Sequence, residues 1–269
     1  MSNPEPQPLW QPTEDQIRGA NMTAFGTAVA DRWQIEITDS DALYDFSVNE
    51  REKFWQSVIE FADIKADDWG ERVLIDADLM PGARWFPDAR LNFAENMLRH
   101  RGDGDAMVFW GEDKVKRRLS FRETHEKVSV LAQALKRAGV KPGDRVGAYL
   151  PNMPEAIIAM LAASSLGAVW SSTSPDFGVQ GVLDRFGQIE PKVLFAVDGY
   201  HYNAKRHDCL AKVKQIAAGL DSLEATVIIP YGDEPVDPGA MPDAVTLDEF
   251  TKDFQAGEIE FTPLPFDHP

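Results

Sequence analysis

The chain has 269 residues, of which 43% are hydrophobic and 26% are charged, and its formal net charge is −17 at pH 7. These values are typical of a globular protein in water, and the negative charge disfavours nucleic acid and anionic membranes as partners. The single cysteine, Cys209, rules out an internal disulfide and favours a reducing compartment, the cytoplasm.

The N-terminus gives no sign of a targeting segment. Its first residues, MSNPEPQPLW, are polar and proline-rich, with no basic region followed by an apolar one. The longest uncharged apolar run, residues 156–170, is shorter than the roughly 20 residues that span a bilayer. We therefore expect no membrane partner.

Residues 1–105 are expected to form an irregular extension that is rich in tryptophan. Ser47 and Glu50 have the spacing of a capping box, and apolar residues at helical spacing follow them, which predicts one helix. A second, short helix is predicted around residues 91–99. The tryptophans are expected to anchor the extension on the main domain; they are Trp10, Trp33, Trp55, Trp69 and Trp85.

Residues 106–269 alternate between strand and helix patterns. A hairpin is predicted from 107–110 and 115–119, and Ser120 with Glu123 forms a capping box for a helix that Gly139 closes. The later elements are predicted as strands at 146–150, 168–172, 192–197 and 225–229, with helices at 154–166, 178–189 and 204–218 between them. This order predicts an α/β fold with a parallel, Rossmann-like sheet that helices flank.

The last part of the sequence carries less regular structure. Beyond Pro230 it is acidic and rich in turn residues, and only a short helix near residues 247–254 is predicted. The final residues, FTPLPFDHP, are expected to be a loop that is cut before its strand.

Common nucleotide and metal motifs are absent from the sequence. Neither G-x-x-x-x-G-K-[ST] nor G-x-G-x-x-G occurs, and the first predicted parallel strand ends in a Pro-Asn-Met-Pro turn at 151–154, which argues against dinucleotide-binding enzymes. No metal site is predicted, because the histidines show no zinc-like spacing with other ligands. Cys209 has no feature that marks it as a nucleophile.

A cluster of tyrosines and cations follows the third predicted parallel strand, at residues 199–206. Open α/β sheets bind ligands at the carboxyl ends of their strands. Asn203 is predicted as a helix N-cap, which places Lys205 and Arg206 in the first helical turn. Two interpretations stay open: an anion site with tyrosines that stack on a purine, or a solvated first turn.

Two further candidates lie near the same rim. Arg185 on the helix at 178–189 is either an exposed charge or a ligand contact. Ser171 and Ser172 are either strand-end caps or part of a ligand surface.

Three segments carry a family resemblance. The segment RWFPDARLNFAENMLRHR resembles the opening region of acetyl-CoA and acetoacetyl-CoA synthetases. The segment LSFRETHEKVSVLAQALKRAGVKPGDRVGAYLPNMPEAIIAMLAASSLGAVWSSTSPDFG is similar to the first core motif of the adenylate-forming acid–CoA ligases. The segment SSTSPDFGVQGVLDRFGQIEPKVLF resembles the acetoacetate–CoA ligase branch.

The resemblance implies the N-terminal part of such a ligase, with an N-terminal extension at 1–105 and the incomplete ligase domain at 106–269. It implies acetoacetate, ATP with Mg²⁺ and coenzyme A as substrates, none of them expected to bind tightly to this part. The family's phosphate loop, acyl pocket and catalytic lysine match nothing in the chain. No catalytic residue is therefore assigned, the chain alone is expected to be inactive, and its expected partner is a C-terminal half.

The resemblance also suggests coenzyme A contacts. Two arginines that bind the 3′-phosphate end of coenzyme A in the acetyl-CoA synthetases correspond to Tyr202 and Lys205, with Arg206 as a substitute for the charge lost at Tyr202. Ser172 corresponds to the small-residue strand end along the coenzyme A path, and Arg185 is assigned to the same surface. Two alternatives remain: a stand-alone coenzyme A- or protein-binding module, and part of an acetate or other short-acid ligase.

Overall fold

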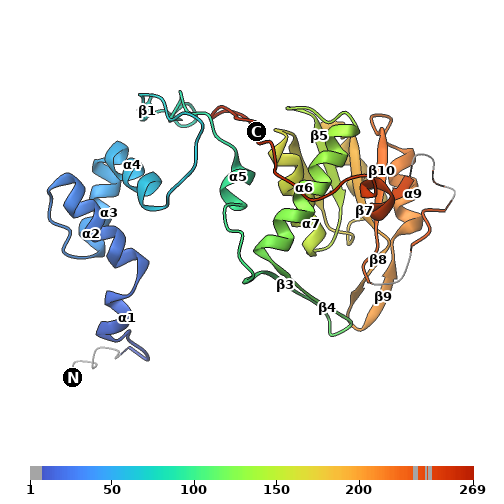
Figure 1. The fold of residues 1–269 in the computed structure, drawn as a ribbon, viewed down its shortest axis with the longest axis horizontal. Helices are drawn as coiled ribbons and strands as arrows, with labels where there is room; N and C mark the ends of the chain where they lie inside the picture. Colours follow the sequence, from blue (N-terminus) through green and yellow to red (C-terminus); the bar gives the residue numbers. More distant parts are fainter. Residues whose placement is uncertain (1–7, 233–235, 240, 242–243) are drawn as a thin grey trace, which may run out of the picture. The chain divides into compact units, whose positions relative to one another are not determined.

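The structure is a computed structural model that describes residues 8–232, 236–239, 241 and 244–269. The chain divides into two compact units, Met1–Ile64 with Gly70–Asp88, and Lys65–Trp69 with Ala89–Pro269 (Figure 1). In the described part of the chain, every helix is too short or too polar to cross a bilayer.

The first unit is mainly helical. Its elements are α1 (Glu14–Arg18), α2 (Asn21–Trp33), α3 (Ser40–Asn49), α4 (Arg51–Phe61) and the short antiparallel pair β1 (Leu74–Ile75) and β2 (Arg84–Trp85). A small core holds α2, α3 and α4 together; its buried members are Phe25, Val29, Leu43 and Phe46. Only α4 was predicted, so the expected irregular extension contains three further helices.

The predicted capping box at Ser47 and Glu50 is wrong. Ser47 lies inside α3, where its hydroxyl donates to the Tyr44 carbonyl at 2.7 Å. The cap of α3 is Asp39, whose carboxylate accepts from the Ala42 N–H at 2.8 Å. Helix α4, which the serine motif was predicted to start, begins at Arg51, and its N-cap residue Glu50 makes no capping hydrogen bond through its side chain.

Three tryptophans of the first unit, Trp33, Trp55 and Trp85, contact other residues of that unit, whereas Trp10 is 70% exposed. Trp33 donates its indole N–H to the Ser57 hydroxyl at 2.8 Å, and Trp55 meets Trp85 edge to face with ring centroids 5.8 Å apart. These contacts hold helices and strands of the first unit together; the expected anchoring on the main domain stays a prediction.

The second unit is built on a five-stranded sheet in which every neighbouring pair is parallel. Its strands are β5 (Arg145–Tyr149), β6 (Val169–Thr173), β7 (Val193–Val197), β10 (Ala225–Ile229) and β11 (Ala244–Thr246), in the order β11-β10-β7-β5-β6. The predicted parallel strands are confirmed. The edge strand β11 was not predicted, because three residues carry too short a pattern.

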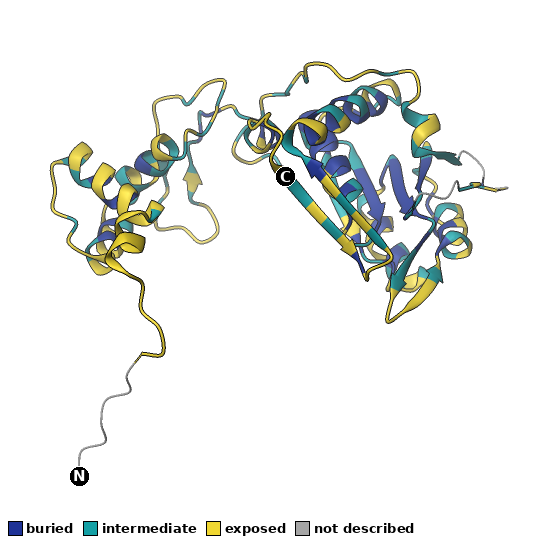
Figure 2. Cartoon of the chain, turned by 60° about the horizontal axis from the view of Figure 1, so that its bottom comes forward, coloured by how far each residue is buried: buried dark blue, intermediate teal, exposed yellow. Residues whose placement is uncertain are grey.

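Helices cover both faces of this sheet (Figures 1 and 2). They are α5 (Phe93–Met97), α6 (Phe121–Arg137), α7 (Pro154–Ser165), α8 (Val179–Ile189), α9 (Leu210–Ala218) and α10 (Leu247–Thr251). Phe195 of β7 packs edge to face on Phe250 of α10, and α6 contacts both α10 and α7, so these three helices share one face. Helices α8 and α9 contact each other on the opposite face, as right-handed crossovers require.

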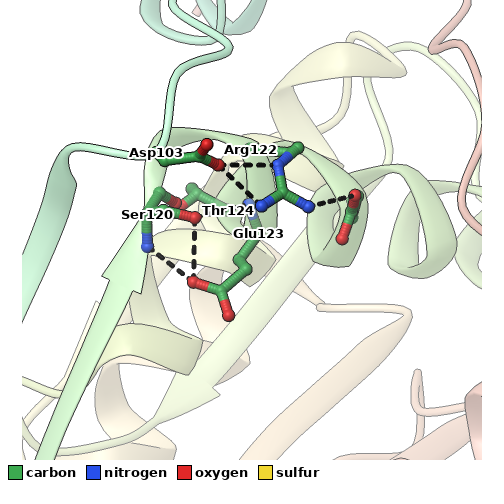
Figure 3. A network of polar contacts seen from close by, with 6 residues as sticks. Asp103, Ser120, Arg122, Glu123 and Thr124 are labelled. Carbon is green, nitrogen blue, oxygen red and sulfur yellow. Dashed lines mark hydrogen bonds and ion pairs between the residues drawn. The ribbon is translucent and has the colours of Figure 1, made fainter.

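The predicted start of α6, which Figure 3 shows, and its predicted end are both confirmed. The Ser120 hydroxyl accepts from the Glu123 N–H at 3.1 Å, and the Glu123 carboxylate accepts from the Ser120 N–H at 2.8 Å. The hydrogen bonds that the Glu123 carboxylate accepts from the N–H and the hydroxyl of Ser120 lower the pKa of Glu123. After the last turn Gly139 has φ +77°, the left-handed conformation that favours glycine.

Two antiparallel hairpins complete the unit. The hairpin of β3 (Asp105–Gly111) and β4 (Val115–Ser120) was predicted and is confirmed. The hairpin of β8 (Gly199–Tyr202) and β9 (Lys205–Asp208) was not predicted. It follows β7 directly and carries most of the candidate site residues.

Candidate functional site

The strand order marks the carboxyl ends of β5 and β7 as the expected position of a ligand. Because β5 lies between β6 and β7, the chain reverses direction between β5 and β7, and open α/β sheets bind ligands at such a reversal. The β8–β9 hairpin leaves the carboxyl end of β7 at this position. Sequence analysis placed the candidate site at the same rim.

The helix predicted at residues 204–218 is wrong in its first part. Asn203 and Ala204 have φ values of 51° and 60°, which make a two-residue turn of the primed kind between β8 and β9. Lys205 and Arg206 therefore lie on a strand, and α9 begins only at Leu210. Their charges therefore do not oppose a helix dipole, and the predicted anion site at a helix start is wrong.

The hairpin separates the candidates onto two faces. Tyr202 pairs with Lys205 across the strands, and cross-strand partners share a face. Arg206 pairs with His201 at the next position and so lies on the other face, since side chains alternate along a strand. The structure brings Tyr202 and Lys205 together and places Arg206 apart from them.

The face with Tyr202 and Lys205 is open to solvent. Tyr202 is 64% exposed, and Lys205 makes no ion pair with any residue that the structure describes. The neighbouring pair on this face, Tyr200 and His207, stacks with ring centroids 5.1 Å apart and planes 22° apart. This face therefore offers aromatic surface beside an unengaged cation, which suits an anionic group attached to a ring.

Tyr200 connects the hairpin to the loop that follows β6. Its hydroxyl donates to the Asp176 carboxylate at 2.7 Å, and this hydrogen bond, with one from Ser174, lowers the pKa of Asp176. Burial and the Asp176 charge raise the pKa of Tyr200. Buried Tyr149 of β5 also contacts this loop, because its hydroxyl donates to the Pro175 carbonyl at 2.7 Å. Burial raises the pKa of Tyr149 to about 12.

Arg206 is engaged with the protein. Its guanidinium donates to Asp198 at 2.7 Å and lies 3.9 Å from Asp208. The side chain of Asp198 is only 13% exposed and also accepts from the Tyr231 N–H at 2.8 Å. These contacts give Arg206 a structural role, because it neutralises a mostly buried carboxylate at the end of β7.

Ser172 and Arg185 lie on other elements. Ser172 is exposed on the edge strand β6, opposite Ala148 of β5. Arg185 on α8 donates to the Gly181 carbonyl at 2.6 Å, and its guanidinium lies 4.4 Å from the centre of the Phe177 ring. The structure shows no direct contact of either residue with the hairpin.

Cys209 is fully buried at the base of the hairpin, and burial raises the pKa of its thiol to about 11. A protonated, inaccessible thiol is a poor nucleophile. Within the described residues, no three or more His, Cys, Asp or Glu side chains gather into a group that could hold a metal ion.

Sequence reasoning missed Asp176 and Asp198, which organise the rim. Both acids come within a few residues of a strand's end, where open sheets place functional side chains. That position was the available signal, but it did not show which groups the two carboxylates would bind.

Comparisons with known proteins agree over 98% of the chain. Residues 93–256 match the family model of the AMP-binding enzymes, and residues 40–97 match the acetyl-coenzyme A synthetase N-terminus. The acetoacetyl-coenzyme A synthetase of Rhizobium meliloti (strain 1021) is 49% identical over 264 residues, which are 98% of this chain and 40% of the relative. The acetoacetyl-CoA synthetase of Gallus gallus is 39% identical over 98% of this chain and 41% of its own length.

A solved structure gives the same result. The acetoacetyl-CoA synthetase from Streptomyces lividans matches with a TM-score of 0.90 and 39% identity, over 98% of this chain and 40% of that protein. The chain therefore spans about 40% of the length of the relatives it matches.

Proposed function

The chain belongs to the AMP-binding enzyme family, and from this premise we propose that it supplies the N-terminal part of an ATP-dependent acetoacetate–CoA ligase. The observation that carries the proposal is the 49% identity to an acetoacetyl-coenzyme A synthetase across 98% of the chain. We propose the cytoplasm as its location, since its one cysteine is free.

The reaction has two steps. A carboxylate oxygen of acetoacetate bonds to the α-phosphorus of ATP, and pyrophosphate leaves. The thiolate sulfur of coenzyme A then bonds to the acyl carbon, and AMP leaves. The first step is needed because a carboxylate is a poor electrophile, whereas an acyl phosphate anhydride is a good one.

We assign to this chain a share of coenzyme A binding. Lys205 supplies an unengaged cation for the 3′-phosphate end, and Tyr202 on the same hairpin face supplies a ring beside it. Ser172 and Arg185 are proposed along the same path, and Arg206 is proposed to hold the hairpin at Asp198 while adding positive charge. We assign residues 1–105 to the extension and 106–269 to the ligase domain.

The first step is proposed to need residues outside these 269. The sequence contains no Ser/Thr/Gly-rich phosphate loop ending in lysine, and its described acidic residues form no metal cluster. Mg²⁺ is therefore proposed to arrive with ATP.

A chimera tests the proposed function. Residues 1–269 replace the corresponding part of the Rhizobium meliloti relative, and AMP release is measured with ATP, coenzyme A and either acetoacetate or acetate. We expect acetoacetate-dependent AMP release from the chimera and none from the 269-residue chain alone. A folded chimera without activity would refute the ligase and favour a binding module, and a preference for acetate would indicate another short-acid ligase.

Lys205→Ala tests the coenzyme A contact in the chain itself. We expect calorimetry to show about tenfold weaker binding of coenzyme A, because one charge-assisted hydrogen bond to phosphate is lost. Dephospho-coenzyme A, which lacks the 3′-phosphate, should bind both proteins alike. Lys214→Ala, which removes an exposed lysine from α9, is the matched control. Equal affinities for coenzyme A in all three proteins would remove Lys205 from the site.

A further inference from the structure

The turns of the two hairpins touch through one carboxylate. Glu112 lies in the turn between β3 and β4, and its two oxygens accept from the N–H groups of Asn203 at 2.7 Å and Ala204 at 2.9 Å. Asn203 and Ala204 form the turn between β8 and β9, and the ladder of that hairpin does not use these two N–H groups. Successive N–H groups in a left-handed turn form a cradle for an anion, and here Glu112 fills it.

A second contact between the hairpins lies nearer their base. Tyr231, which follows β10, meets Phe109 of β3 and His201 of β8 with ring centroids 5.9 Å and 5.7 Å apart. Gly111 approaches the Tyr231 hydroxyl so closely that a Cβ there would lie 2.4 Å from it. The β8–β9 hairpin is therefore held at both its tip and its base.

The β3–β4 hairpin is a firm support for this contact. Arg117 of β4 makes two hydrogen bonds to the Glu155 carboxylate of α7, at 2.5 Å and 2.9 Å, and the Glu155 side chain is only 14% exposed. Bidentate pairs of this kind fix geometry. Both hairpins pair in sheets of only two strands, which are marginal on their own, so the β8–β9 hairpin depends on its contacts with neighbouring elements.

We propose that Glu112 is a positioning residue for the coenzyme A-binding hairpin: its carboxylate fixes the Asn203–Ala204 turn and so pre-orders the face that carries Tyr202 and Lys205. This inference rests on the proposed function, because it assigns that face to coenzyme A. Without Glu112 the hairpin tip is free to move, and the cost of ordering it falls on coenzyme A binding.

The test compares Glu112→Gln with Asp113→Asn in the 269-residue chain. Asp113 lies in the same turn, also has a positive φ, and pairs with Lys116 at 2.8 Å instead of with the other hairpin. Both substitutions remove one negative charge from the same turn, so their comparison separates the loss of charge from the loss of the hydrogen bonds to Asn203 and Ala204. Calorimetry with coenzyme A gives the affinities, and NMR gives the amide resonances and exchange rates of Asn203 and Ala204.

We expect Glu112→Gln to bind coenzyme A about fivefold more weakly than Asp113→Asn, because a glutamine oxygen can replace only part of the carboxylate's hydrogen bonding. In Glu112→Gln alone, the Asn203 and Ala204 amide protons should move upfield and exchange faster. A merely structural effect would not be confined to these two amides.

Equal affinities and unchanged amides in the two variants would overturn the positioning role while leaving the coenzyme A site in place. If the unsubstituted chain binds no coenzyme A, the proposed site fails and the positioning role fails with it. Activity of the chimera is a separate measurement, so failure of the ligase function is distinguishable from failure of this inference.

Discussion

Asn92→Ala is expected to lower the free energy of unfolding of the α/β unit by about 3 kcal/mol. Asn92 is 1% exposed, and its side chain forms hydrogen bonds with three segments of the chain. Its amide donates to the Ser164 carbonyl at 3.0 Å and to the Thr262 carbonyl at 2.9 Å, and its oxygen accepts from the Ala94 N–H at 2.8 Å. Alanine removes the cap of α5 and leaves buried carbonyl groups with fewer partners.

Hydrogen exchange of the amides in β5 and β7 measures this loss in the unit that contains Asn92. Asn96→Ala is the matched control, because Asn96 also exchanges two hydrogen bonds with a backbone, that of Lys65, but does so near the surface. We expect the control to cost about 1 kcal/mol or less, since water can replace the lost partner. Equal costs for the two variants would contradict the role of burial.

Asn92→Asp separates the two functions of the side chain. Aspartate keeps the oxygen that caps α5 but turns a second oxygen toward the carbonyls of Ser164 and Thr262. We expect it to destabilise the unit at neutral pH at least as much as alanine does. Stability should recover as pH falls, because the protonated acid can again donate a hydrogen bond.

The sequence was sufficient for the parts of the fold that local chemistry decides. The capping box of Ser120 and Glu123 and the left-handed Gly139 each involve neighbours in the chain, and both were predicted correctly. The buried strands β5, β7 and β10 carry continuous apolar runs between turn residues, which also identifies them locally.

The misplaced elements depend on contacts that are distant in the sequence. Strand β11 has only three residues and is defined by its pairing with β10. Helix α2 has no side-chain cap. Helices α2 and α3 bury Phe25 and Phe46 in a core that also includes residues of α4. Tertiary packing of this kind overrides local propensity, so a single pattern could not reveal it.

The sequence predicted that most of the candidate residues follow β7, but it did not predict that they form a hairpin. The end of β7 was identified from topology alone, whereas Asn203 was read as a helix cap because asparagine favours caps and left-handed turns equally. The turn was not predicted because glycine is the usual residue at the position of Ala204, and alanine at φ 60° is uncommon. The two hydrogen bonds that Glu112 accepts from the N–H groups of Asn203 and Ala204 stabilise this conformation.

Gly199→Ala is expected to weaken coenzyme A binding by more than tenfold and to destabilise the β8–β9 hairpin by about 1–3 kcal/mol. Gly199 begins β8 and pairs with Asp208 of β9. A Cβ at this position would lie 2.6 Å from the His207 carbonyl oxygen, a backbone atom, and 3.1 Å from the Arg206 guanidinium. Since the opposing backbone cannot rotate away, the strands must separate at their base.

We expect this separation of the strands to affect the hairpin face with Lys205 through the ion pair of Arg206 with Asp198. Opening the base displaces Arg206 from Asp198, leaves a mostly buried carboxylate without its cation, and turns the face with Lys205 away from its fixed direction. Calorimetry with coenzyme A and amide exchange across β8 and β9 measure the two effects.

Gly187→Ala is the control, because nothing lies within 4 Å of a Cβ built at that position on α8. Alanine in a helix interior should stabilise the unit by up to about 1 kcal/mol and leave coenzyme A binding unchanged. If Gly199→Ala kept both the affinity and the amide protection of the unsubstituted chain, the hairpin would not depend on its close-packed base. Loss of protection with unchanged affinity would instead separate the hairpin from coenzyme A, and the contacts of Lys205 would have to be assigned to another ligand.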